Sequence, residues 1–132
     1  MCLITSNPVI QQSSVDIVAY KVCIFENDCY KLISNNEAIE FGKFYVNNDS
    51  LVMLDNISTL TIFSGFFHLF RYKVDAESAC DIVSEKIEKE CRVIKTIVPA
   101  NTEFMIGVTF WGTDLLTPKG SIAAKQVIYN KV

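Results

Sequence analysis

The sequence predicts an α+β fold in which one domain, residues 1–132, forms a mostly antiparallel β-sheet with one main helix, at about residues 75–91, packed on it. Half of the residues are hydrophobic and 20% are charged, which is sufficient to bury a core. Short segments rich in β-branched and aromatic residues recur between turn signals along most of the chain. Only one stretch carries the periodicity of an amphipathic helix.

The first half of the chain predicts strands separated by polar turns. Val15–Phe25 (VDIVAYKVCIF) is typical of a strand. CYKLIS at 29–34 is typical of the second strand of a hairpin that pairs with it. A two-residue turn at Asn27 and Asp28 would pair Cys29 with Glu26. Two short strands (KFYV and LVML) and a long apolar segment (TLTIFSGFFHLF), broken by a glycine, follow at 43–46, 51–54 and 59–70.

The helix is predicted from VDAESACDIVSEKIEKECRV at 74–93. Asp75 is expected to be the N-cap, and Glu77 would lie in the first turn, where the helix dipole favours acids. The apolar positions follow the i, i+3, i+4, i+7 spacing of one buried face: Ala76, Ala79, Cys80, Val83, Ile87 and Cys91. The acidic side chains between them are then expected to be solvated.

The last third of the chain predicts further strands. CRVIKTIV at 91–98 and TEFMIGVTFW at 102–111 are typical strands, with Gly107 marking a bulge in the second. GTDLLTPKGS at 112–121 is typical of a loop, and IAAKQVIYNKV at 122–132 of the last strand. If that last strand lies at the sheet edge, it can pair with a second copy, so a homo-oligomer is among the expected states.

Charge and composition exclude several function classes. The net charge of −3 disfavours an extended nucleic-acid partner. No apolar run approaches the roughly 20 residues that span a membrane, and the first residues lack the pattern of a signal peptide, so we expect a cytoplasmic protein. One histidine and five scattered cysteines provide no ligand set, so neither a metal nor another cofactor is expected. The cysteines are expected to be reduced and mostly buried.

His68, the only histidine, lies among large apolar residues. In a strand it shares one face with Phe66, and both faces of the segment are apolar, which predicts a central strand. Its imidazole is either packed in the core or in contact with a ligand. Arg71, Tyr72 and Lys73 follow, a combination suited to a phosphate and a stacked base or, alternatively, to a solvated connection before the helix.

Other candidate sites are fewer. Trp111, at a predicted loop edge, is either a binding platform or part of the core. A nucleophile at Cys2 would need removal of Met1, and no spacing supports pairing a cysteine with His68. The paired carboxylates of the helix belong to its solvated face.

The segments resemble small uncharacterised proteins of phages and bacteria. The chain begins Met-Cys-Leu, as many of those do, and SGFFHLF followed by DAESA corresponds to their G-[FI]-H-x-F step before a helix, with the histidine one place later. DIVAYKV, IVPANTEF and AAKQVIYNKV extend the similarity over most of the chain in short motifs. The resemblance implies a phage-encoded protein that acts in the cytoplasm of its host.

The same order of segments resembles the ADP-ribosyltransferase fold. Tyr20-Lys21 stands where that fold places an Arg or His near the nucleotide, and Gly65 to Leu69 stands at its middle step. The last segment, 121–132, contains no acid, although the fold needs a catalytic Glu there. The resemblance therefore implies a scaffold that holds a nucleotide without turning it over.

The function hypothesis that follows is a non-enzymatic binding protein, of a phage counter-defence type, that sequesters a nucleotide-like signal. Its expected ligand-binding residues are Phe66, His68, Arg71, Tyr72, Lys73, Trp111 and Lys21. One alternative is a protein–protein inhibitor or assembly module, whose partner would be a host immune protein. A second alternative is a transferase- or hydrolase-type enzyme that uses His68.

Overall fold

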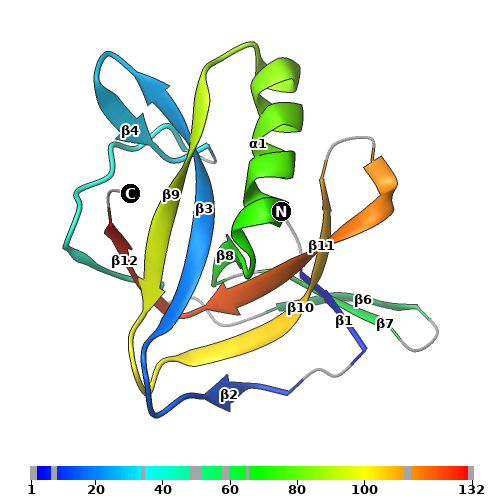
Figure 1. The fold of residues 1–132 in the computed structure, drawn as a ribbon. Helices are drawn as coiled ribbons and strands as arrows, with labels where there is room; N and C mark the ends of the chain where they lie inside the picture. Colours follow the sequence, from blue (N-terminus) through cyan, green and yellow to red (C-terminus); the bar gives the residue numbers. More distant parts are fainter. Residues whose placement is uncertain are drawn as a thin grey trace.

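The computed structural model describes residues 3–6, 9–33, 35–47, 52–57, 60–64, 66–111 and 114–130, without the side chains of 52, 54–57, 60–64, 109–111 and 114–119. Within these ranges, twelve strands form one antiparallel sheet and one helix, α1 (Lys73–Ile87), packs on it (Figure 1). The predicted α+β class is confirmed.

Ten of the strands follow one another in the order β5-β12-β9-β3-β8-β11-β10-β1-β7-β6, while β2 pairs with β10 and β4 with β3. Their bounds are β1 Leu3–Thr5, β2 Gln11–Gln12, β3 Ile17–Glu26, β4 Cys29–Lys31, β5 Phe44–Val46, β6 Val52–Ile57, β7 Leu60–Ser64, β8 Phe67–Phe70, β9 Cys91–Val98, β10 Glu103–Trp111, β11 Asp114–Ala124 and β12 Gln126–Asn130.

The β3–β4 hairpin forms as predicted. Cys29 is the register partner of Glu26, so the turn between them contains only Asn27 and Asp28. These two residues have φ angles of 54° and 58°. Two successive positive φ angles are typical of a type I′ turn, whose twist matches that of the strands it joins.

The long strand β3 has very different neighbours on its two edges. On one edge it pairs with β9 over Ile17–Ile24. On the other it meets β8 at a single register pair, Tyr20 with Phe70, and its far end pairs with β4. Beyond Tyr20 the two strands are therefore no longer joined by a ladder, and this separation positions the candidate site.

Side chains alternate across β3 and form two separate cores. Ala19 and Cys23 belong to one buried cluster together with Tyr129 of β12. Val22 and Ile24 point to the opposite face and pack with the buried face of α1, which includes Ala76, Ala79 and Val83. Since residues i and i+2 of a strand share a face, Lys21 lies on the Tyr129 side.

The helix differs from its prediction at both ends. Its N-cap is Tyr72, which makes no side-chain capping bond, so Asp75 is not the N-cap. Instead, Asp75 Oδ2 accepts a hydrogen bond from the backbone N–H of Gly120 in β11, at 3.1 Å. The carboxylate thus fastens the first turn to the sheet, a long-range role that local capping patterns do not indicate.

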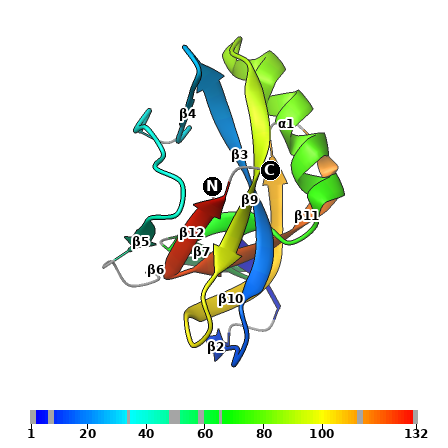
Figure 2. The same ribbon diagram turned by 60° about the vertical axis from the view of Figure 1, so that its left-hand side comes forward.

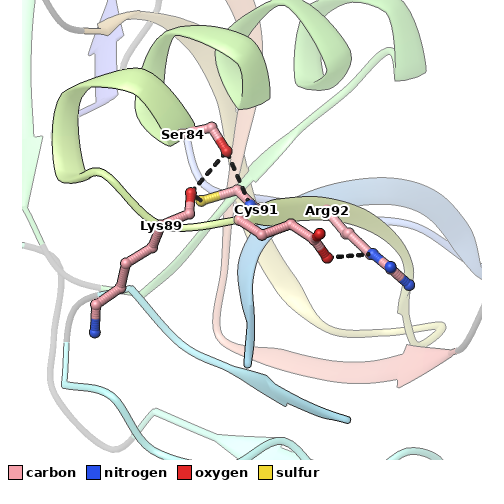
Figure 3. A network of polar contacts seen from close by, with 5 residues as sticks. Ser84, Lys89, Cys91 and Arg92 are labelled. Atoms are coloured by element: carbon pink, nitrogen blue, oxygen red, sulfur yellow. Dashed lines mark hydrogen bonds and ion pairs between the residues drawn. The ribbon is translucent and has the colours of Figure 1, made fainter. Parts of the chain in front are cut away.

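The end of α1 is closed by a polar network. Glu88, with φ 56°, is the left-handed C-cap. Ser84 Oγ donates to the Lys89 carbonyl at 2.8 Å and accepts from the Cys91 N–H at 2.9 Å (Figure 3). The predicted helix was therefore too long, because this network turns the chain so that Cys91 begins β9.

Two predictions for the C-terminal third are also wrong. Of the loop predicted at 112–121, residues 114–121 belong to β11, which begins at Asp114, and 112–113 lie outside the described residues. A register shift between Thr109 and Trp111 of β10 accommodates the irregular start of β11. The bulge lies at this shift and not at Gly107, which pairs in register with Ser121.

The predicted last strand is in fact two, β11 and β12, separated at Lys125. The strand β12 lies between β5 and β9, and the end of β11 lies between β8 and β10. Neither therefore offers the free edge on which the oligomer prediction relied.

Candidate functional site

A pocket of about 510 Å³ lies where β3 and β8 separate. The helix α1 and the chain from β4 to β5 lie on opposite sides of β3 (Figure 2), and both contribute to the lining. The described lining residues are Lys21, Val22, Leu32, Ile33, Asn35, Glu37, Tyr45, Val46, Asn47, Phe66, Phe67, His68, Phe70, Ala79, Val83 and Tyr129.

Three of the residues predicted to bind a ligand meet in this pocket: Lys21, Phe66 and His68. They come from β3, from the residue before β8 and from β8 itself, and Lys21 and Phe66 are 45 positions apart in the sequence. The structure thus gives these residues one shared cavity, and their role in binding stays a prediction.

Arg71, Tyr72 and Lys73 lie elsewhere, exposed at the connection from β8 to α1. The Arg71 guanidinium lies 5.4 Å from the centre of the Tyr72 ring, and Lys73 pairs with Glu77 at 3.9 Å. These contacts are local, and none of the three residues is part of the described pocket lining.

Two further candidates fall outside what the structure describes. Trp111 ends β10, but its side chain is outside the described part of the chain, as is the whole of Cys2.

Lys21 is the cation of the pocket. Its side chain shares a face of β3 with the buried Ala19 and Cys23, and its Nζ donates a hydrogen bond to the His68 carbonyl oxygen at 2.9 Å. Desolvation lowers the pKa of Lys21, an effect that the negative form of Cys23 partly opposes. No ion pair joins this ammonium to a carboxylate among the described residues.

Tyr129 provides a buried hydroxyl in the same pocket. The residue is fully buried, and its Oη has no hydrogen-bond partner among the described residues. Burial raises the pKa of Tyr129 well above its usual range, with smaller contributions from Cys23, Tyr45 and Glu37. Buried hydroxyls without a hydrogen-bond partner are uncommon in folded proteins. The Tyr129 hydroxyl is therefore a candidate to bond a ligand.

Tyr45 adds a second phenol beside Tyr129. The two ring centres are 5.2 Å apart and their planes are inclined by 55°. Tyr45 Oη accepts a hydrogen bond from the backbone N–H of Glu40 at 2.9 Å. Its own proton is therefore directed elsewhere, so the hydroxyl can donate to a bound molecule.

Exposed polar groups belong to the lining as well. The Glu37 N–H donates to Asn35 Oδ1 at 3.0 Å, and Asn35 Nδ2 donates to Glu37 Oε2 at 3.2 Å. Both residues are exposed, so they form the outer rim of the pocket. The rim thus carries a carboxylate, while the cation lies further in.

Aromatic residues form much of the apolar wall. Phe67 belongs to the buried group on the Tyr129 side of the sheet, and Phe70 to the group beneath α1. Phe66 is buried despite a φ of 57°, a conformation that bulky residues rarely adopt. This backbone conformation directs its ring into a third buried group with Leu3, Met105 and Ala123.

His68 is buried and also belongs to the pocket lining. Its strand lies between β3 and β11, which confirms the prediction of a central strand. The imidazole is on the same face of β8 as Phe70, while the backbone carbonyl of His68 holds Lys21. The two interpretations of this residue, packing and ligand contact, are therefore compatible.

Sequence reasoning missed Tyr129, Tyr45, Phe67 and the rim residues. Tyr129 and Tyr45 look like ordinary strand tyrosines in the sequence, and no local motif marks them. They reach Lys21 only through the order β5-β12-β9-β3, which joins distant parts of the chain.

No group of three or more His, Cys, Asp or Glu side chains among the described residues is arranged to hold a metal ion. No helix in the described ranges has the length and apolar character needed to cross a membrane. The four cysteines that the structure describes are free thiols, of which Cys23 and Cys91 are buried and Cys29 is exposed.

Comparisons of the chain with protein-family models, with curated proteins and with solved structures find no match.

Proposed function

We propose that this protein is a non-enzymatic binding protein that holds a small nucleotide-like ligand in the pocket between β3 and β8. The observation that carries the proposal is the composition of the lining. Aromatic rings form its walls, and Lys21, with its ammonium, and Tyr129, with a buried hydroxyl, belong to the same lining. Ligand sites commonly combine apolar walls with a few well-placed polar groups.

The size of the pocket supports this class of ligand. Its volume of about 510 Å³ falls within the range of roughly 300–1,000 Å³ that is typical of small-molecule sites. Aromatic rings such as Phe67 and Tyr45 can stack on a nucleobase, an interaction that tolerates many bases.

Binding without turnover fits the lining better than catalysis. His68 and Glu37 are the imidazole and the carboxylate among the described lining residues, and no cysteine is among them. Glu37 is exposed and bonded to Asn35, whereas His68 is buried. The described lining therefore contains no serine, threonine or cysteine beside the imidazole, the pairing that a hydrolase of the triad type requires.

The resemblance to phage proteins gives the proposal its biological setting. A phage protein that binds a nucleotide signal tightly can lower the free concentration of that signal in the infected cell. Sequestration of this kind needs affinity for the ligand, but no chemistry on it.

Isothermal titration calorimetry tests the proposal with ADP-ribose, cyclic ADP-ribose and cyclic AMP as ligands. We expect heat of binding from at least one of them. Val46→Trp, at the half-exposed rim, should fill the pocket and weaken that binding at least about tenfold, which corresponds to ~1.4 kcal/mol.

Val74→Trp is the matched control, because Val74 is exposed on α1 and outside the described lining. It should bind as the wild type does. No heat from any ligand with a folded sample would contradict the proposal, as would unchanged binding by Val46→Trp.

A second candidate function is a protein–protein module that uses β5. This short strand ends the continuous strand order and exposes Phe44 and Val46, two apolar side chains, to solvent. An edge of this kind can accept a strand from a partner or from a second copy. If β5 pairs with a second copy of the chain, the wild type should form a dimer and Phe44→Lys should remain a monomer. Light scattering measures the two masses.

A further inference from the structure

We infer that Lys21 and Tyr129 form an anion subsite inside the pocket, which binds one oxyanion group of an aromatic ligand. This inference rests on the proposed function, because it assigns chemistry to the same cavity. It goes beyond that function by specifying which end of the ligand enters first and what charge that end carries.

The strand register places the two residues on one face. Tyr129 is the partner of Thr96, and Thr96 is the partner of Ala19. Antiparallel partners share a face, and Lys21 follows Ala19 by two residues, so it shares that face as well. Cys23, which follows Lys21 by two residues on this face, packs in one buried cluster with Tyr129, so Lys21 and Tyr129 lie on the same side of the sheet.

The hydrogen bonds of the two groups leave capacity for a ligand. An ammonium has three N–H donors, and the described structure occupies one of those of Lys21, through the His68 carbonyl. The Tyr129 hydroxyl has no partner among the described residues. Both groups can therefore donate to an acceptor that enters the pocket.

The charge of Lys21 decides which acceptor fits. A desolvated ammonium without a carboxylate partner is unfavourable, and its low-dielectric surroundings strengthen its attraction to an anion. An oxyanion would satisfy this charge and accept the hydrogen bond of Tyr129 at the same time. A neutral carbonyl would accept the hydrogen bond of Tyr129 but would not neutralise the charge of Lys21.

The rim has the opposite charge. Glu37 carries a carboxylate at the exposed end of the pocket, bonded to Asn35. This separation of charge favours a ligand whose anionic group faces inward and whose hydrogen-bond donors, such as an exocyclic amine, face outward. The aromatic body of the ligand then lies between the rings of Tyr45 and Phe67.

Two matched probe pairs test the subsite by calorimetry and fluorescence titration. AMP and adenosine share a ring system, and only AMP carries a phosphate. 8-Anilino-1-naphthalenesulfonate and N-phenyl-1-naphthylamine likewise share aromatic rings, and only the first is an anion. The wild type should prefer the anion of each pair at least about tenfold, as expected for a hydrogen bond to a charged group.

Three variants locate the origin of that preference. Lys21→Met keeps the length of the side chain and should reduce the preference to about one- to twofold. Tyr129→Phe should reduce it by a smaller factor, about two- to threefold. Lys95→Met is the control, since Lys95 is the register partner of Tyr20 and so lies on the opposite face, and it should keep the full preference.

The thermal stability of the variants separates ligand binding from a structural role. Because a desolvated charge is removed, Lys21→Met should unfold at the same temperature as the wild type or at a higher one. Loss of the anion preference in such a stable variant supports the subsite, whereas loss accompanied by unfolding counts against it.

The outcomes also distinguish the subsite from the proposed function. If AMP and adenosine bind the wild type equally well, the subsite is overturned while nucleotide binding stands. If only the sulfonate pair binds, with a preference that depends on Lys21, the subsite stands and the nucleotide ligand is overturned. A preference that persists in Lys21→Met, or no binding by any probe, overturns the subsite.

Discussion

Lys21 and Cys23 share the buried face of β3, and burial favours the neutral form of each. Desolvation lowers the pKa of Lys21 and raises the pKa of Cys23 to about 12. The shift for Cys23 arises first from burial, while the nearby Lys21 opposes it. The thiol is therefore a packing group and a poor nucleophile at neutral pH, which agrees with a binding role for the pocket.

The shift of Cys23 predicts a loss of stability in alkali. An unfolded thiol releases its proton near 9.0, whereas the folded one keeps it until about 12. Between these values the native state binds more protons than the unfolded state, so the free energy of unfolding falls as pH rises, by up to about 1.4 kcal/mol per pH unit from this one group.

Urea unfolding of the wild type and of Cys23→Ala between pH 6 and 11 measures this effect. The two stability curves should run parallel below about pH 8 and converge above about pH 9, where only the wild type carries the thiol. Curves that stay parallel throughout would show that the thiol is not the cause.

Gly107 illustrates a second effect of single residues. A Cβ atom at this position would collide with the Ile4 carbonyl oxygen of β1. We expect Gly107→Ala to lower the free energy of unfolding by about 1–3 kcal/mol, because backbone cannot move aside as a side chain can.

Gly120→Ala is its matched comparison. A Cβ there would lie 3.1 Å from ring atoms of Tyr72 and 3.4 Å from Asp75 Oδ2, and the Tyr72 side chain is 51% exposed, so its ring has solvent to move into. Its effect should stay within about 0.5 kcal/mol, as for most surface substitutions. Thermal unfolding of both variants measures the difference. Equal losses in the free energy of unfolding would mean that the β1 backbone moves aside as easily as the Tyr72 ring.

The helix α1 shows how local and distant signals combine in one element. The apolar spacing correctly predicted its buried face, with Ala76, Ala79 and Val83 against the sheet. Its ends depend on contacts to other elements, through Asp75 at Gly120 and through Ser84 at Cys91. Periodicity therefore located the helix, whereas tertiary hydrogen bonds set its boundaries.

Ser84 is the residue on which the α1–β9 corner depends. Ser84→Ala leaves the Cys91 N–H and the Lys89 carbonyl without this partner, and should lower the free energy of unfolding by about 1–3 kcal/mol. Ser78→Ala, on the same helix, should change it by less than about 0.5 kcal/mol. Urea denaturation gives both values. If Ser84→Ala leaves the free energy of unfolding unchanged, packing and not the Ser84 hydrogen bonds stabilises the α1–β9 corner.

The whole molecule is one sheet whose central strands separate. The strand β3 is paired with β9 over eight register positions but with β8 at one. The space between them is the pocket, which Lys21 and His68 help to line. A cavity at this position costs packing energy, which a bound ligand can restore.

Ligand binding should therefore raise the stability of the entire fold. A ligand at about 100 times its dissociation constant adds roughly 2.7 kcal/mol to the free energy of unfolding. For a chain of this length we expect a rise in the melting temperature of about 5–15 °C.

Differential scanning fluorimetry with the tightest of the nucleotides named above, or with AMP, measures the shift. Val46→Trp, in which the pocket is filled, should melt at the same temperature with and without ligand. A shift of equal size in this variant would place binding outside the pocket.

The sequence determined those features that depend on neighbours along the chain. The Asn27-Asp28 turn, the register of Glu26 with Cys29, the buried face of α1 and the central position of the His68 strand all follow from local pattern. Short-range preferences suffice for these, because each one concerns residues a few positions apart.

Tertiary structure alone decided the pairing order and hence the candidate site. Lys21, His68 and Tyr129 meet because β12, β9, β3 and β8 are neighbours, although they are far apart in sequence. The aromatic and basic segment at 71–73, which the sequence favoured, is instead turned outward by the start of α1. Strand pairing is long-range and gives no local signal, so the sequence predicted several of the site's residues but not the cavity that joins them.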